Sequence, residues 1–218
     1  MNVLIIGANG KVGQKLVEKM KDSENYTPIA MVRKTEQQEK YKSQDVETVL
    51  ADLEGSIDPI TEAAKNADAI VFTAGAGGAG DDKTMLVDLD GAVKSMKAAE
   101  RADVKRFVLI SGNGVHKWHE NTHQEWMDEI PVYSAAKYYA DVWLQNTDLD
   151  YTIIRPGHLN DGEGSGKIQI GDELGNKPMA REDVASVILA SLEENQTIGK
   201  AFDVINGDTS IEEALSTL

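Results

Sequence analysis

Short, almost continuously apolar segments alternate along the chain with longer segments of mixed polarity. The short segments are rich in β-branched residues, which is typical of strands buried on both faces of a sheet. They lie at Asn2–Ile6, Thr27–Val32, Val46–Leu50, Ala69–Phe72, Arg106–Ile110 and Tyr151–Arg155. The segments between them predict helices at Lys11–Lys21, Thr35–Lys42, Asp58–Asn66, Asp82–Ala102 and Val132–Asn146.

The longest predicted helix carries Leu86, Leu89, Val93 and Met96 at helical spacing, which predicts a stripe facing the core. Strands that alternate with helices favour a parallel sheet with right-handed crossovers and helices on both faces. The expected fold class is therefore α/β, a Rossmann-type doubly wound parallel sheet.

Beyond Arg155 the alternation changes. A glycine-rich loop is expected at Asp161–Gly166, strands at Lys167–Ile170 and Ala201–Ile205, and helices at Arg181–Glu194 and Ile211–Leu218. This stretch is too short for a separate domain. We predict a single domain over residues 1–218, in which residues 156–218 form a small C-terminal cap.

The composition narrows the class of partner. The chain has 22 basic and 37 acidic residues, a net charge of −15, which disfavours nucleic acid and anionic membranes. It has no Cys, so disulfides and thiolate metal sites are excluded. No apolar run approaches the roughly 20 residues that cross a bilayer, and the first residues lack a signal-peptide pattern. We expect a cytoplasmic protein with a small-molecule substrate, either a monomer or a weak homo-oligomer.

A glycine-rich turn, GANGKVG, joins the first predicted strand to the first predicted helix. Glycines there let backbone N–H groups approach a pyrophosphate at the start of the helix. Turns use glycine without any ligand as well, but this position favours a dinucleotide site. The predicted contacts are Gly7, Asn9, Gly10, Lys11, Val12 and Gly13.

The end of the second predicted strand indicates which dinucleotide is bound. An NAD site usually places Asp or Glu about 20 residues past the glycines, where it holds the ribose 2′-hydroxyl. Arg33 and Lys34 stand there instead. Because a guanidinium forms bidentate hydrogen bonds with phosphate, we predict NADP (NADPH) in preference to NAD. An ordinary solvated basic pair is the alternative.

Together with Arg33 and Lys34, the GANGKVG turn resembles the atypical short-chain dehydrogenase/reductase family. The resemblance is to small NAD(P)H-binding members that are similar to flavin/biliverdin reductases and NmrA-like proteins. Four further segments match in order, namely Asp52-Leu53, Phe72–Ala76, YTIIRPG at Tyr151–Gly157 and REDVA at Arg181–Ala185. The match spans nearly the whole chain and is not specific for a substrate.

The resemblance implies further cofactor contacts. Asp52 would touch the adenine and Leu53 would pack on it, while Ala74, Gly75 and Ala76 would lie beneath the cofactor ribose. The backbone at Pro156, Gly157 and His158 would line the nicotinamide pocket. These roles are expectations from the family.

Tyr133 and Lys137 fit the YxxxK pair of this family, and Ser111 fits its substrate-steadying hydroxyl. Residues four apart share a helix face, so Lys137 can lower the pKa of the Tyr133 phenol from about 10. The phenol could then exchange a proton as a hydride moves, with Lys137 also on the nicotinamide ribose. Tyr and Lys also occur four apart by chance, and some members bind NADPH without catalysis.

Three of the four His residues fall close together, beside two Trp residues. His116, His119 and His123 could share a helix face as metal ligands, but the sequence has no HExxH pairing and the family needs no metal. We therefore predict no metal. We expect a loop over the substrate side of the nicotinamide, with Trp118 and Trp126 offering apolar surface. A solvent-exposed loop without a role is the alternative.

We predict an NADP(H)-binding oxidoreductase that transfers a hydride to a small planar or carbonyl substrate, such as a flavin or a quinone. The chain would then be a single NAD(P)-binding domain, with residues 156–218 as a cap on the substrate side. One alternative is a non-catalytic, NmrA-like NADP(H) sensor. Another is a nucleotide-sugar epimerase or dehydratase, to which the TIIRPG strand is similar but whose C-terminal substrate domain is larger. The sequence names neither the substrate nor the direction of hydride transfer, because variable loops build substrate pockets in this fold.

Overall fold

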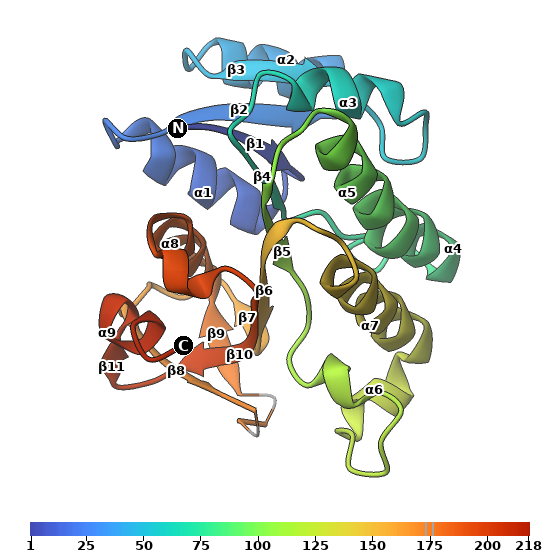
Figure 1. The fold of residues 1–218 in the computed structure, drawn as a ribbon, viewed down its shortest axis with the longest axis vertical. Helices are drawn as coiled ribbons and strands as arrows, with labels where there is room; N and C mark the ends of the chain where they lie inside the picture. Colours follow the sequence, from blue (N-terminus) through green and yellow to red (C-terminus); the bar gives the residue numbers. More distant parts are fainter. Residues whose placement is uncertain (173, 176) are drawn as a thin grey trace.

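A nine-stranded sheet forms the centre of the computed structural model, which describes residues 1–172, 174–175 and 177–218 (Figure 1). The strand order is β11-β8-β10-β6-β5-β4-β1-β2-β3. The strands that pair in parallel are β1 (Asn2–Ile6), β2 (Thr27–Val32), β3 (Glu47–Leu50), β4 (Ala69–Phe72), β5 (Arg106–Ile110), β6 (Asp150–Pro156) and β10 (Lys200–Asn206). The predicted α/β fold with a doubly wound sheet is confirmed.

Helices cover both faces of this sheet, as Figure 1 shows. They are α1 (Lys11–Lys21), α2 (Thr35–Lys42), α3 (Asp58–Ala64), α4 (Asp81–Lys83), η1 (Thr84–Gly91), α5 (Ala92–Arg101), η2 (Val115–Lys117), α6 (Trp126–Glu129), α7 (Pro131–Gln145), α8 (Arg181–Glu193), η3 (Asn195–Thr197) and α9 (Ile211–Leu215). One apolar core lies beneath α1, α8 and α9, and another lies beneath α3, α5 and α7. None of the helices in the described part of the chain could span a membrane.

The longest predicted helix is divided in the structure. It begins with α4, widens into the π-helix η1 and continues as α5. Because a π turn is wider than an α turn, it rotates the side chains, and the predicted stripe is wrong at its start. Leu86 is 39% exposed, Leu89 and Val93 are half-buried, and Met96 is buried. The side chain that η1 buries instead is Asp88, which is 2% exposed.

The last third of the chain continues the sheet beyond β6. β10 pairs in parallel with β6, β8 (Lys167–Gly171) is antiparallel to β10, and β11 (Thr209–Ser210) is antiparallel to β8. β7 (His158–Asn160) and β9 (Pro178–Ala180) form a separate parallel pair, and α8 packs against α1. Residues 173 and 176 of the predicted cap lie outside the described residues. That this part caps the substrate stays a prediction.

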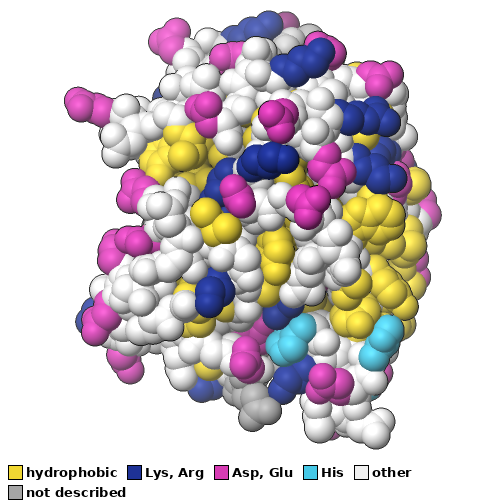
Figure 2. Space-filling model, in the orientation of Figure 1, with side chains coloured by type: hydrophobic (Ala, Val, Ile, Leu, Met, Phe, Trp, Pro, Cys, Tyr) yellow, Lys and Arg dark blue, Asp and Glu magenta, His cyan; other side chains and the backbone are white. Residues whose placement is uncertain are grey.

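Acidic and basic side chains are interspersed over the face in Figure 2, so the excess of acidic residues does not form one continuous patch there. Hydrophobic side chains gather on the side of α7 in this view. The large exposed apolar residues of η1 and α7 are Met85, Leu86, Tyr139 and Trp143.

Candidate active site

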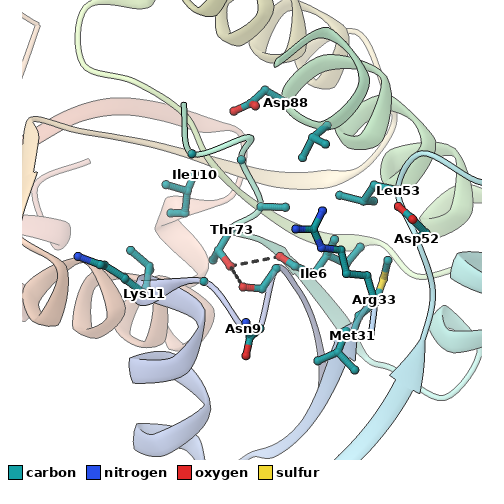
Figure 3. A pocket seen from close by; sticks show the side chains of 18 of the residues that line it. Ile6, Asn9, Lys11, Met31, Arg33, Asp52, Leu53, Thr73, Asp88 and Ile110 are labelled. Atoms are coloured by element: carbon teal, nitrogen blue, oxygen red, sulfur yellow. Dashed lines mark hydrogen bonds between the residues drawn. The ribbon is translucent and has the colours of Figure 1, made fainter. Parts of the chain in front are cut away.

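A cavity of about 650 Å³ lies at the carboxyl ends of β1 to β5 (Figure 3). In doubly wound sheets, ligands bind at this edge, where the strand order reverses, here between β1 and β4. Thirteen of the predicted site residues line it: Gly7, Asn9, Gly10, Lys11, Val12, Arg33, Asp52, Leu53, Ala74, Gly75, Ser111, Tyr133 and Lys137. The fold thus brings together residues from most of the chain.

A second cavity, of about 370 Å³, adjoins the first and shares Ser111, Tyr133 and Leu159 with it. The predicted residues Pro156, Gly157 and His158 line this second cavity, as does Trp126. Gly13, Lys34, Ala76 and Trp118 are absent from the linings of both. The two cavities meet at the candidate catalytic hydroxyl groups.

The glycines of the phosphate loop permit close contacts between backbone segments. Gly7 has φ +92°, and a Cβ atom there would lie 2.5 Å from the backbone nitrogen of Ala74. A Cβ at Gly13 would lie 2.3 Å from the carbonyl oxygen of Gly7. Helix α1 begins after Gly10 with no side chain capping its first turn. This loop fits a pyrophosphate, because its backbone donors can face the cavity.

Arg33 lies at the adenosine end of the larger cavity. Figure 3 shows it extending from the end of β2 toward the side where Leu53 and Asp52 lie. Gln37 Oε1 accepts hydrogen bonds from the backbone N–H groups of Arg33 and Lys34, both at 3.2 Å. Within the described chain the Arg33 guanidinium forms no ion pair, so it can accept a phosphate without giving up a partner.

A buried ion pair that the sequence analysis missed lies at the opposite end. Lys137 Nζ is 3.1 Å from Asp88 Oδ1 and donates to the carbonyl oxygen of Ile110 at 3.3 Å. Asp88 Oδ2 accepts from the backbone N–H of Ala76 at 2.8 Å. Asp88 therefore fixes both the Lys137 ammonium and the loop after β4. No local pattern marks this residue, since the α-helical periodicity on which the stripe rested gave no reason to place Asp88 inside.

This pair changes the electrostatics expected at Tyr133. Burial raises the pKa of Tyr133, the charge of Lys137 opposes that rise, and Asp88 adds to it, so that the pKa lies above its ordinary value. Burial would lower the pKa of Lys137, but Asp88, Tyr133 and Asp141 together outweigh it and the pKa is raised. Lys137 does lower the pKa of Tyr133, as predicted, but the desolvation of the phenol raises this pKa by more.

Ser111 follows β5 and is 4% exposed. Its Oγ atom has no hydrogen-bond partner of normal length among the described residues, and neither does Oδ1 of the nearby Asp141. A buried hydroxyl without a partner at the junction of two cavities can hold a ligand oxygen.

Behind Ser111 lies a second set of buried charges. Arg155 Nε donates to Asp141 Oδ2 at 2.7 Å, and Arg155 Nη1 lies 3.9 Å from Asp203 Oδ1. Asp203 Oδ2 accepts from the backbone N–H of Gly114 at 2.9 Å, which anchors the loop after β5. Burial raises the pKa of Asp203 to about 7, against the opposing attraction of Arg155.

The three clustered His side chains take separate partners. His116 Nδ1 lies 3.6 Å from Asp203 Oδ1, the ring of His119 packs on Tyr138 with centroids 4.5 Å apart, and His123 Nε2 contacts Asp128 at 3.1 Å. In the described part of the chain, no group of three possible ligands gathers around a metal position.

Comparisons with known proteins agree with this geometry. A family model described as NAD(P)H-binding matches residues 7–195. The Bacillus subtilis protein named "Uncharacterized sugar epimerase YhfK" is 46% identical over 219 residues, which cover 100% of both chains. The solved structure of the oxidoreductase ylbE from Lactococcus lactis has a TM-score of 0.89 and 36% identity, over 100% of this chain and 96% of that chain. ChuY, an anaerobillin reductase from Escherichia coli O157:H7, shares the fold with a TM-score of 0.82 and 24% identity, over 96% and 99% of the two chains.

The sheet, the phosphate loop and the cavity define an NAD(P)-binding protein of the Rossmann type. The chain belongs to the NAD(P)H-binding family, and its resemblance to the atypical short-chain dehydrogenases/reductases is confirmed.

Proposed function

We propose that this protein is an NADPH-dependent reductase that acts on a small planar or carbonyl substrate. The observation that carries the proposal is the arrangement of the two cavities. The larger one runs from the phosphate loop and Arg33 to Ser111, Tyr133 and Lys137, and the smaller one shares Ser111 and Tyr133. A cofactor in the first cavity and a substrate in the second would meet at these side chains.

Arg33 supports NADPH over NADH. Its guanidinium borders the cavity beside Asp52 and Leu53, where the family places the adenosine. It can form charge-assisted hydrogen bonds with a 2′-phosphate, each worth about 1.5–3 kcal/mol. NADH has a hydroxyl group at the 2′ position instead, and it therefore gains less binding free energy from Arg33.

A reduced nicotinamide supplies a hydride when it is bound. Tyr133 supplies a proton more readily than it removes one, because its raised pKa keeps the phenol protonated at neutral pH. The Ser111 hydroxyl can donate a hydrogen bond to a substrate carbonyl oxygen. Asp88 keeps Lys137 in place beneath Tyr133, whose ring centroid lies 5.7 Å from Lys137 Nζ. This arrangement suits proton donation to a substrate oxygen as the hydride is transferred.

Calorimetric titration with NADPH and NADH tests the cofactor. We expect NADPH to bind at least about tenfold more tightly, equivalent to about 1.4 kcal/mol, and Arg33→Ala to remove that preference. Lys34→Ala is the matched control, because Lys34 is the neighbouring cation but lines neither cavity. Equal affinities in the wild type would refute the preference for NADPH.

Loss of NADPH absorbance with flavins, quinones and aldehydes tests the reaction. Linear tetrapyrroles belong in the panel because ChuY, which has the same fold, is described as an anaerobillin reductase. Tyr133→Phe and Ser111→Ala should lower kcat by about 10²-fold or more if they transfer the proton and hold the carbonyl. No oxidation with any acceptor would count against a reductase.

Two other functions have a specific observation behind them. The first is a sensor that binds NADPH without turnover, which the pairing of Lys137 with Asp88 suits. In such a sensor, Tyr133→Phe would leave the function unchanged. The name of YhfK motivates a test with nucleotide sugars, where a rise in melting temperature would favour an epimerase.

A further inference from the structure

Arg181 is a second cation at the phosphate end of the larger cavity, and no cofactor role was expected for it. It is the first residue of α8, and it lines the cavity together with Lys11, the first residue of α1. Its side chain is only 20% exposed. A cation at the start of a helix is disfavoured by the helix dipole unless an anion lies nearby.

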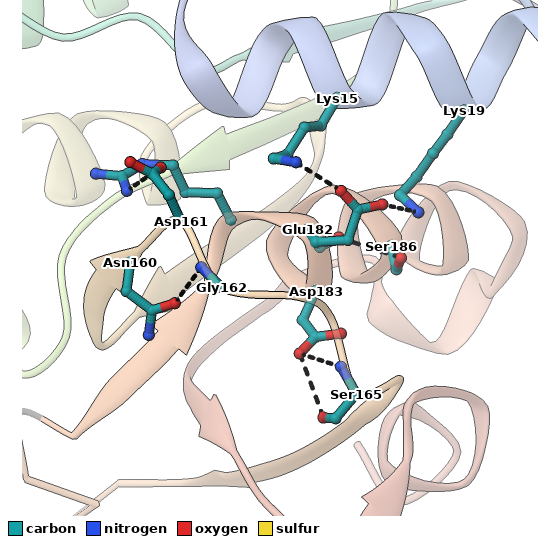
Figure 4. A network of polar contacts seen from close by, with 10 residues as sticks. Lys15, Lys19, Asn160, Asp161, Gly162, Ser165, Glu182, Asp183 and Ser186 are labelled. Atoms are coloured by element: carbon teal, nitrogen blue, oxygen red, sulfur yellow. Dashed lines mark hydrogen bonds and ion pairs between the residues drawn. The ribbon is translucent and has the colours of Figure 1, made fainter.

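Ion pairs fix the beginning of α8 against α1. Glu182, the residue after Arg181, forms ion pairs with Lys15 Nζ at 2.8 Å and with Lys19 Nζ at 2.5 Å (Figure 4). Both lysines belong to α1, the helix that follows the phosphate loop. Arg181 is therefore held beside this loop by its neighbours in α8.

The anion that Arg181 contacts belongs to the protein itself. Asp161 Oδ1 accepts from Arg181 Nη1 at 2.6 Å, and Asp161 Oδ2 lies 2.5 Å from Lys11 Nζ. The two cations line the cavity, whereas Asp161 is absent from its lining. Asp161 is 56% exposed, so this pairing is screened by solvent and weak. Lys11 and Arg181 lower the pKa of Asp161, which keeps it charged.

The loop that carries Asp161 is anchored on its far side. Asp183 accepts from the backbone N–H groups of Ser165 at 3.0 Å and Gly166 at 2.9 Å. Among the residues that the structure describes, the Asp161 side chain forms no further hydrogen bond or ion pair beyond those to its two cations. It can therefore separate from them without displacing the rest of its loop.

We propose that Arg181 and Lys11 bind the pyrophosphate of the dinucleotide, and that Asp161 is a displaceable counter-ion which competes with it for both cations. This inference rests on the dinucleotide site of the proposed function. Arg181 uses one guanidinium nitrogen on Asp161, and a guanidinium can hold two phosphate oxygens at once. A pyrophosphate carries two charges and outcompetes one exposed carboxylate.

Titration of the purified protein with NADPH, NADH and ADP-ribose, by calorimetry, tests this role. All three ligands contain the pyrophosphate, so Arg181→Gln should weaken each of them by a similar factor, about tenfold. The ratio of NADPH to NADH affinity should stay unchanged, in contrast to the effect of Arg33→Ala. Asp161→Asn should strengthen all three by about threefold to tenfold, because it removes the competitor.

Lys21→Gln is the matched control. It removes the same charge from α1, yet Lys21 is exposed at the far end of that helix and does not line the cavity. Its affinity for the three ligands should match that of the wild type, and circular dichroism should show that every variant is folded. In the Arg181→Gln background, Asp161→Asn should strengthen binding less than it does alone, since only Lys11 remains to be released.

The outcomes separate this inference from the function on which it rests. If the wild type binds dinucleotides but Arg181→Gln binds them equally well, the role of Arg181 is overturned and the reductase proposal stands. If Asp161→Asn weakens binding, Asp161 positions the cations and the counter-ion role is overturned. If the wild type binds no dinucleotide, both proposals fail.

Discussion

The two ends of the larger cavity hold their charges in opposite ways. At the end that holds the phosphate loop and the adenosine side, which we call the phosphate end, Lys11 and Arg33 are exposed and Arg181 is partly so. At the catalytic end, Lys137 and Asp88 are 5% and 2% exposed, and each is the partner of the other. Exposed charges cost little to maintain and can change partners, whereas a buried charge must remain paired.

This difference separates affinity from stability within one site. We expect substitutions at the phosphate end to change ligand binding and leave the free energy of unfolding almost unchanged. Substitutions among the buried charges should change the free energy of unfolding and the pKa values of their neighbours. Four experiments can break or sharpen this comparison.

The largest effect on stability is expected from Arg155→Met. The substitution leaves Asp141 and Asp203 buried without their shared cation, and the free energy of unfolding should fall by about 3–5 kcal/mol. Urea denaturation measures it. Arg101→Met is the control, because Arg101 is 55% exposed and 3.7 Å from Asp58, and such a pair is worth about 0–1 kcal/mol. Similar losses in both variants would show that burial does not separate the two classes.

Asp88→Asn should have the next largest effect. Asparagine keeps an oxygen for the Ala76 N–H but leaves Lys137 without its counter-charge, at a cost of about 3 kcal/mol in the free energy of unfolding. The pKa of Tyr133 should also fall, because the unopposed lysine favours the phenolate. Tyrosinate absorbance, compared with that of Asp88→Asn/Tyr133→Phe, measures this pKa.

The control for Asp88→Asn is Asp90→Asn in the same helix. Asp90 is 52% exposed and pairs with Lys94 at 2.8 Å, so neither stability nor the pKa of Tyr133 should change appreciably. A pKa of Tyr133 that stays the same in Asp88→Asn would contradict the electrostatic role of Asp88.

A pH-dependent effect of similar size is expected from Asp203. Its pKa is about 7 in the folded protein, as against about 3.9 in an unfolded chain, so the folded state holds the proton more tightly between these values. The resulting stabilisation is present in full below about pH 4 and is lost as the pH rises through about 7. The difference in unfolding free energy between the wild type and Asp203→Asn should therefore change by about 4 kcal/mol over this range, since each pKa unit corresponds to about 1.4 kcal/mol.

Asp208→Asn controls for the loss of an acidic residue at an exposed position. The pH dependence of its difference from the wild type is the reference for Asp203→Asn. If the difference for Asp203→Asn changes with pH no more than this reference does, the Asp203 carboxyl does not titrate near neutrality in the folded protein.

The smallest effect on stability is expected from Arg33→Gln. The free energy of unfolding should change by no more than about 0.5 kcal/mol, because the side chain is exposed and forms no ion pair in the described chain. The same variant should lose the preference for NADPH, as proposed above for Arg33→Ala. A large loss of stability would show that Arg33 supports the fold rather than the ligand.

The sequence by itself determined the features that depend on short-range order. The parallel strands of the main sheet were predicted within one residue at their ends, because such a sheet requires continuous apolar segments, whereas β7, β9 and β11 were not predicted. The glycine loop was found by its place after the first strand and Arg33 by its spacing from the glycines, and both border the cavity in the structure. Their roles in binding stay predictions until a ligand is measured.

The tertiary structure alone decided which side chains meet across long stretches of sequence. Asp88 reaches Lys137 because η1 departs from α-helical geometry, and Asp161 reaches Lys11 from 150 positions away. Local periodicity carries no information about either contact. A cation at the first position of α8 was the one available signal for Arg181, since a helix dipole disfavours it there. Spacing along the chain thus specifies the backbone of the site, and packing between distant elements decides which of its charged side chains form pairs.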